Sequence, residues 1–392
     1  MQECIKCLYK ANHPFGITFN KKGICSGCII HEEKFNLNWK KIFNKLYKKV
    51  VKYKKKTGYD CIIPIRGSPE YFYVVNIAKN ELGLNPLLVS YNHHFNSSAG
   101  IKNLDLIREN FDADIYIHTK NPTIYKKIIR ETLFSNLNIH WPFLAGETSF
   151  CVKLAIEKKI PLIIWPYNQQ TEQVGSHSYT DEVEMTNRGR YEYDLAGINP
   201  TDIVKTSNLI NEKDINELVY PTSYEIYKNK IIGIYLSNFL PWDTRKFSEM
   251  AVKNFNAKCS KNFRTFDTYD RIDNQTYMSV HDILKFKKFH YSRVTDNLCR
   301  EIRFKRITKK NAKLIEKFYQ SEKPKNAINN FFKWIDANDK TWDWFENYFK
   351  IKYPKKPILN VECKKFINSF MTNNQSLVRE NKYILIGKGI NI

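Results

Sequence analysis

Short apolar runs alternate with longer amphipathic stretches through the middle of the chain. Five runs have the length and composition of buried strands: residues 60–65 (DCIIPI), 86–92 (PLLVSYN), 112–119 (DADIYIHT), 160–166 (IPLIIWP) and 230–240 (KIIGIYLSNFL). Residues 71–83, 100–110, 124–134 and 148–159 carry a helical pattern instead. This alternation predicts an α/β fold with a doubly wound, mostly parallel sheet and helices on both faces. Ligands of such sheets bind beyond the carboxyl ends of the strands, so the residues after each strand are candidate site residues.

The segments on either side of this core follow different patterns. In residues 36–57 apolar positions recur every three or four residues and lysines fill the opposite face, which predicts a basic linker helix. A solvated surface helix is the simplest interpretation, and an RNA-binding helix is the alternative. We predict an N-terminal unit over residues 1–35, the linker helix, an α/β core over 58–240, an α-rich region over 241–349 and a tail over 350–392.

Two CxxC pairs stand in the N-terminal unit, Cys4 with Cys7 and Cys25 with Cys28, separated by seventeen residues. Each pair can place two thiolates on one tetrahedral metal ion, and the spacer is long enough to bring the pairs together. Disulfides are the alternative, and a cytoplasmic chain disfavours them. We therefore predict a zinc ribbon whose ion is structural, because four cysteines leave no open coordination position.

Charge and composition add less to this interpretation. The chain has 392 residues, 63 Lys and Arg against 40 Asp and Glu, and a formal net charge of +23. Such a balance suits an anionic partner, yet the lysines are spread along the chain, so we do not expect nucleic acid on this ground. No apolar run approaches the roughly 20 residues that cross a bilayer. The first ten residues lack the apolar region of a signal peptide, and we expect a cytoplasmic protein without a membrane span.

Several motifs together resemble the N-acetyl sugar amidotransferases of bacterial surface-polysaccharide and flagellar-glycan biosynthesis. These enzymes are zinc-ribbon members of the PP-loop ATP pyrophosphatase superfamily. The resemblance extends to about residue 349. It rests on the paired CxxC motifs, YDCIIPI, GLNPLLVSYNHHFNSSAGIKNL, IPLIIW, NFLPWD, and a long block over residues 263–308 that begins FRTFDTYDRID.

The resemblance implies a reaction in lipopolysaccharide or flagellar-glycan biosynthesis. An acetamido group on a sugar or nucleotide-sugar becomes an acetamidino group: its oxygen attacks the α-phosphate of ATP, pyrophosphate leaves, and ammonia then displaces AMP. The family's ammonia comes from a separate glutaminase, and this chain has no recognisable glutaminase motif, so a glutaminase partner is implied. The implied cofactors are structural zinc, together with ATP and Mg²⁺ for an active enzyme, because the departing phosphates need donors and cations.

Candidate site residues follow from the matching blocks. As catalytic residues we expect Glu70, His94, Asp270 and Asp282. The nucleotide-binding candidates are Arg66, Gly67, Ser68, Asn92 and Trp165. The substrate-binding candidates are His93, Asn103, Arg271, His281, Lys285, Arg300 and Arg303. Taken one at a time, an acid or base of this kind is more often a surface ion pair than a functional residue.

The chain departs from the family after the first strand. The family has Ser-Gly-Gly-Lys-Asp-Ser where residues 66–71 read RGSPEY. Pro69 has no N–H for a phosphate, and Ser68, Pro69 and Glu70 have the sequence of a self-capped helix start. The family's Gly-Glu after the later Trp is also absent at residues 166–167.

These departures leave two alternatives to the amidotransferase. One is a non-catalytic or repurposed relative that keeps the sugar site and has lost ATP chemistry. The other is a tRNA-modifying or RNA-binding protein, since PP-loop domains with zinc ribbons also act on tRNA. The block at residues 263–308 favours the sugar.

Overall fold

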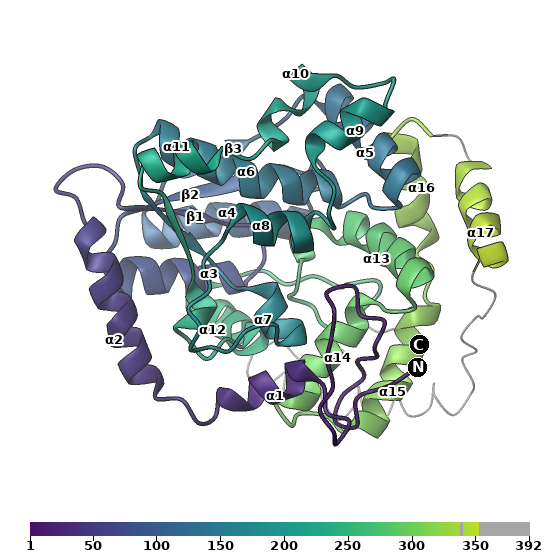
Figure 1. Ribbon diagram of the computed structural model, residues 1–392, viewed down its shortest axis with the longest axis horizontal. Coiled ribbons are helices and arrows are strands. Elements are labelled where there is room, and N and C mark those ends of the chain that lie inside the picture. The colour runs from purple at the N-terminus through teal and green to yellow at the C-terminus, as the bar shows by residue number, and fades with distance from the viewer. Residues whose placement is uncertain (338–339, 353–392) are drawn as a thin grey trace.

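The computed structural model describes residues 1–337 and 340–352 and confirms the predicted α/β architecture (Figure 1). The strands are β1 (Cys61–Pro64), β2 (Pro86–Tyr91), β3 (Ile115–His118), β4 (Leu162–Trp165) and β5 (Ile232–Tyr235). All of them pair in parallel, in the order β3-β2-β1-β4-β5. The strand order reverses where β1 pairs with β4, and the crevice beyond that pair is where such sheets bind ligands.

Helices cover both faces of the sheet because successive strand side chains point to opposite sides. Ile63 of β1 faces a cluster built on α3 (Glu70–Asn76), α4 (Ser98–Phe111) and α12 (Thr244–Phe255). Its neighbour Ile62 faces the opposite cluster, which is built on α6 (Trp141–Glu157). Burial on both faces explains why β1, β2 and β4, which are buried along their whole length, read as near-continuous apolar runs.

The remaining helices flank this core. The N-terminal part contains α1 (Ser26–Glu33) and α2 (Trp39–Val50), and the core adds α5 (Pro122–Asn136), α7 (Gln169–Val174), α8 (Asn187–Gly189), α9 (Pro200–Thr206), α10 (Glu212–Ile215) and α11 (Ser223–Lys228). The C-terminal region is helical, as predicted: α13 (Gln275–Phe289), α14 (Arg293–Arg303), α15 (Lys309–Ser321), α16 (Lys325–Trp334) and α17 (Lys340–Lys352). The predicted tail lies outside the described residues beyond Lys352.

The N-terminal unit packs against α7, α14 and α15 rather than extending into solvent. Its four cysteines share an apolar cluster with Val174 of α7 and with side chains of α14 and α15, such as Leu298 and Ile315. Gly27 lies so close to the core that a Cβ there would stand 2.2 Å from Nη2 of Arg303 and 2.3 Å from the carbonyl oxygen of Gln173. The N-terminal unit and α14 are therefore in direct contact, although they lie far apart in the sequence.

Local structure after β1 differs from the sequence prediction in two respects. The helix predicted over residues 71–83 is divided into α3 and a π-helical turn, η2 (Ile77–Glu81). The predicted Ser68 cap is wrong: Pro69 occupies the cap position without a side-chain cap, and the Ser68 hydroxyl donates to Oδ1 of Asp273 at 2.6 Å. In the described part of the chain, no helix combines the length and apolar character that a bilayer crossing requires.

Candidate functional site

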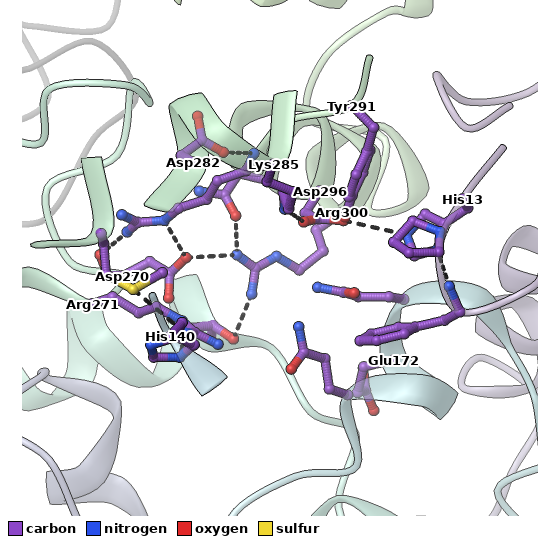
Figure 2. Close-up of a pocket in the computed structure, with 18 of the residues that line it drawn as sticks. His13, His140, Glu172, Asp270, Arg271, Asp282, Lys285, Tyr291, Asp296 and Arg300 are labelled. Carbon is purple, nitrogen blue, oxygen red and sulfur yellow. Dashed lines mark hydrogen bonds and ion pairs between the residues drawn. The ribbon is translucent and has the colours of Figure 1, made fainter. Parts of the chain in front are cut away.

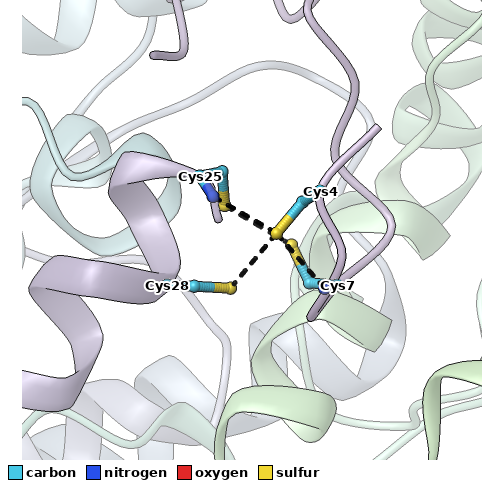
Figure 3. A group of neighbouring side chains, drawn as sticks. All are labelled: Cys4, Cys7, Cys25 and Cys28. Atoms are coloured by element: carbon cyan, nitrogen blue, oxygen red, sulfur yellow. Dashed lines mark hydrogen bonds between the residues drawn. The ribbon is translucent and has the colours of Figure 1, made fainter. Parts of the chain in front are cut away.

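The four N-terminal cysteines form a group that could hold a metal ion (Figure 3). Their sulfurs all lie within 4.8 Å of one another, with 3.6 Å between those of Cys7 and Cys25 and 4.0 Å between those of Cys4 and Cys28. A tetrahedral zinc ion with Zn–S bonds of about 2.3 Å sets its sulfurs about 3.8 Å apart, so the four thiols fit zinc. The backbone N–H groups of Lys6, Cys7 and Cys25 point at the Cys4 sulfur, as suits a thiolate.

The turn from β1 to α3, where we expected nucleotide-binding residues, is packed inside the protein. A Cβ on Gly67 would stand 2.2 Å from the carbonyl oxygen of Gly100, and a Cβ on Gly100 would stand 2.6 Å from Cα of Asp273. The Asn103 amide donates to the carbonyl oxygen of Gly67 at 2.8 Å and binds both backbone groups of Lys258. These contacts pack the Gly67 side of the turn against α4 and against the turn at Asp273.

Two charged side chains of this turn have different surroundings. Arg66 is not a mobile cation, because its guanidinium binds both carboxylate oxygens of Glu147 on α6, with Nε 2.8 Å from Oε1, and stacks on Phe143. Glu70 is 3% exposed, and its Oε2 has no hydrogen-bond partner. Burial, and then the nearby Asp270, raise the pKa of Glu70 to about 8.

The polar residues after β2 fold back on one another. The Asn92 side chain accepts from the backbone N–H of His94 at 2.8 Å and donates to Thr119. His93 is buried with Nε2 3.5 Å from Oδ2 of Asp273. His94 has a left-handed backbone (φ 66°), and its ring contacts those of Tyr125 and Trp334.

The larger of two neighbouring cavities, about 200 Å³, lies between the N-terminal unit and the C-terminal helices (Figure 2). His13 reaches it from the N-terminal unit, His140 from the start of α6, and Glu172 from α7. The C-terminal part contributes most of the labelled side chains: Asp270, Arg271, Asp282, Lys285, Tyr291, Asp296 and Arg300. Segments almost 300 residues apart in the sequence therefore line one space.

Most charges around this cavity are paired. Burial raises the pKa of Asp270, but Arg293 and Arg300 outweigh burial and hold that pKa at about 2. Asp282 accepts from Nε of Arg264 at 2.7 Å and from the backbone N–H of Arg293. Asp296 accepts from the hydroxyls of Tyr9 and Tyr291 and lies 3.5 Å from Nζ of Lys285. Such a network holds the side chains that line the cavity in fixed positions.

Arg271 differs from these residues. Its backbone is left-handed (φ 49°), an unfavourable conformation for a residue with a Cβ. Among the described residues no carboxylate is within ion-pair distance of its guanidinium, which binds Nε2 of His140 at 3.1 Å. Burial, and then the neighbouring ring of His281, hold the pKa of His140 well below its usual range, so the imidazole is neutral. Arg271 therefore presents a positive charge that a ligand anion can meet.

The smaller cavity, about 90 Å³, opens at the carboxyl ends of β1, β4 and β5, where the strand order reverses. Arg66, Glu147, Trp165 and Tyr235 line it. Both cavities share the same boundary residues, which are Leu144, Tyr167, Gln169, Asp194 and Arg271. The cavity at the strand ends and the cavity among the C-terminal helices thus share a boundary, called the junction below, that carries one acidic and one cationic side chain, Asp194 and Arg271.

The predicted site residues are distributed unevenly over this architecture. The larger cavity is lined by Asp270, Arg271, His281, Asp282, Lys285 and Arg300, and the smaller one by Arg66, Arg271 and Trp165. Neither cavity is lined by Gly67, Ser68, Glu70, Asn92, His93, His94, Asn103 or Arg303. Arg303 instead packs on Tyr9 beside the cysteine group. Sequence reasoning missed His13, His140, Glu147, Glu172 and Asp194, which stand outside any motif that could have marked them.

Comparison with known proteins gives one family match. Residues 249–371 match the model of the C-terminal domain of WbpG-like LPS biosynthesis proteins. No curated protein matches the chain. Among solved structures, an NH3-dependent NAD synthetase from Campylobacter jejuni in complex with nitrate is similar over 50% of this chain and 92% of its own. That likeness has 12% identity and a TM-score of 0.28, which is too low to support any inference about this chain.

Proposed function

We propose that the chain is an ATP-dependent amidotransferase-like protein of surface-polysaccharide or flagellar-glycan biosynthesis that acts in the cytoplasm. Its substrate is an N-acetylated sugar or nucleotide-sugar held in the larger cavity, and its ammonia comes from a partner glutaminase. The proposed reaction converts the acetamido sugar, ATP and ammonia into the acetamidino sugar, AMP and pyrophosphate. One observation carries the proposal: the cavity at the carboxyl ends of the parallel strands and the cavity among helices that match the LPS biosynthesis domain share five lining residues.

The walls of the larger cavity suit a polar, anionic ligand. Aromatic side chains such as Phe15, Tyr193 and Phe289 provide apolar surface for a sugar ring. Arg271 has no carboxylate partner among the described residues and can bind a phosphate of a nucleotide-sugar through its forked N–H groups. The acetamido group would then lie at the junction, beside the crevice of the sheet.

The buried turn favours a second candidate, a sugar-binding relative without ATP chemistry. Gly100 contacts both Gly67 and Asp273, and the Ser68 hydroxyl donates a hydrogen bond to Asp273. These contacts occupy residues that we expected to bind the nucleotide. Both candidate functions include a structural zinc ion in the cysteine group, and neither specifies which residues would bind Mg²⁺.

The first experiment separates the two candidates. The purified chain is incubated with nucleotide-activated N-acetyl sugars, ATP, Mg²⁺ and ammonium chloride, which replaces the glutaminase. The amidotransferase predicts AMP release and a sugar product about 1 Da lighter by mass spectrometry. Sugar binding by calorimetry, without binding of a non-hydrolysable ATP analogue, would instead establish the sugar-binding relative.

A variant locates the sugar. We expect Arg271→Gln to weaken nucleotide-sugar binding about tenfold or more, because one charge-assisted pair is lost. The matched control is Arg188→Gln, which removes an exposed arginine paired with Glu192 on the surface. If the two variants bound the nucleotide-sugar with equal affinity, the larger cavity would not be the sugar-binding site.

A further inference from the structure

We propose that the carboxylate of Asp194 is the binding group for a cationic nitrogen at the junction of the two cavities, and that its ligand is an amidinium. This inference rests on the proposed function, in which an amidinium is the product. It names a residue that no motif marks.

Asp194 is distinguished from the other carboxylates of the two cavities by having no partner. Glu147 binds Arg66, Glu172 binds Lys34, Asp243 binds Arg306, and Glu301 binds Arg245 and Arg306. Asp270, Asp282 and Asp296 are paired as described above. Within the described part of the chain, Asp194 is the one carboxylate lining these cavities for which no hydrogen bond or ion pair is found.

The segment that carries Asp194 is held firmly in place. Asp194 ends a π-helical turn, η3 (Arg190–Asp194), closed by the bond from the N–H of Leu195 to the carbonyl oxygen of Arg190 at 2.9 Å. The buried Arg190 guanidinium donates to Thr148 Oγ1 at 2.7 Å and to two carbonyl oxygens, and thereby fixes the turn to α6. π-helical turns are rare in proteins, and those that occur are often found at functional sites. The backbone that carries the carboxylate is therefore fixed relative to α6.

An unpaired carboxylate at this depth is energetically costly. Burial raises the pKa of Asp194 to about 7, although the charge of Arg190 opposes burial. The side chain retains partial solvent access, and both cavities reach it. A cation that enters from a cavity would compensate the charge that the protein leaves unpaired.

An amidinium fits this carboxylate better than the alternatives do. It presents two parallel N–H donors that match two carboxylate oxygens, as a guanidinium does. The acetamido group of the substrate is neutral and offers one N–H. A metal ion would need further ligands, and among the described residues the cysteine group alone gathers three or more metal-ligating side chains. Asp194 would therefore favour the product-like state over the substrate.

The test uses two small probes of the same shape, acetamidinium chloride and acetamide, titrated into the full chain and followed by NMR. We expect acetamidinium to bind about tenfold or more tightly than acetamide, since a charge-assisted pair contributes roughly 1.5–3 kcal/mol. Asp194→Asn should abolish that preference. Glu192→Gln, in the same turn but paired with the exposed Arg188, is the matched control and should keep the preference.

The outcomes separate this assignment from the proposed function. A preference that persists in Asp194→Asn, or that is absent from the wild type, overturns the assignment even if the chain makes an acetamidino sugar. A preference that depends on Asp194, in a chain that makes no such sugar, supports the assignment and counts against the reaction. Circular dichroism and thermal melts of each variant verify folding, and Asp194→Ala provides a second variant with the same expected loss.

Discussion

At the scale of single residues, the raised pKa of Glu70 makes the stability of the protein depend on pH. Its folded pKa of about 8 lies above the ordinary value of 4.5, because burial and Asp270 disfavour the charged form. Between these pH values the folded chain binds more protons at this group than the unfolded chain does. The contribution of Glu70 to the free energy of unfolding therefore falls as pH rises through that window, by up to about 1.4 kcal/mol per pH unit.

Glu70→Gln removes this titration. We expect the stability of the variant relative to the wild type to increase from pH 5 to pH 8 in urea denaturation. The increase should level off above the folded pKa. Glu109→Gln, at an exposed position on α4, is the control and should show no such trend. A flat difference for Glu70→Gln across this range would mean that the carboxylate finds a partner in solution.

At the scale of elements, three segments meet without side chains between them: the β1–α3 turn at Gly67, the start of α4 at Gly100, and the turn at Asp273. A Cβ at Gly100 would stand 2.6 Å and 2.8 Å from Cα and Cβ of Asp273. We expect Gly100→Ala to lower the free energy of unfolding by about 1–3 kcal/mol, because overpacking displaces backbone. Gly189→Ala, whose nearest neighbour would be a hydroxyl 3.3 Å away, should cost much less in the same denaturation experiment.

The elements that sequence patterns predicted well are those fixed by burial. Each predicted run contains one of the observed strands. β1, β2 and β4 are buried along their whole length, and such strands need a near-continuous apolar run, whereas β3 is partly exposed. The start of α3 was predicted wrongly for a non-local reason. Local chemistry favours Ser68 as a cap, but Asp273, which lies 205 residues away, accepts the hydroxyl instead. Tertiary contacts of this kind leave no trace in a local pattern.

At the scale of the whole molecule, the candidate site was only partly predictable. The block around Asp270–Arg300 was identified from its sequence and does line the larger cavity. Its counterparts His13, His140 and Asp194 come from three distant segments, and only the packing of the N-terminal unit and of α6 against the C-terminal helices brings them together. The cysteine pairs were predictable because metal chemistry fixes their spacing.

That packing predicts that zinc bound by the cysteine group would support the larger cavity. The cysteine group holds α1 against Arg303 and Gln173, and the same unit carries His13 and Phe15 into the cavity wall. We expect about one zinc ion per chain by elemental analysis. Cys28→Ser should lower both the melting temperature and the affinity for nucleotide-sugar, the affinity by about tenfold or more, since structural zinc contributes folding energy. The control is Cys259→Ser at an exposed position outside the group, which should leave both unchanged. Full sugar affinity in a zinc-free Cys28→Ser protein would show that the N-terminal unit is an independent appendage rather than a wall of the site.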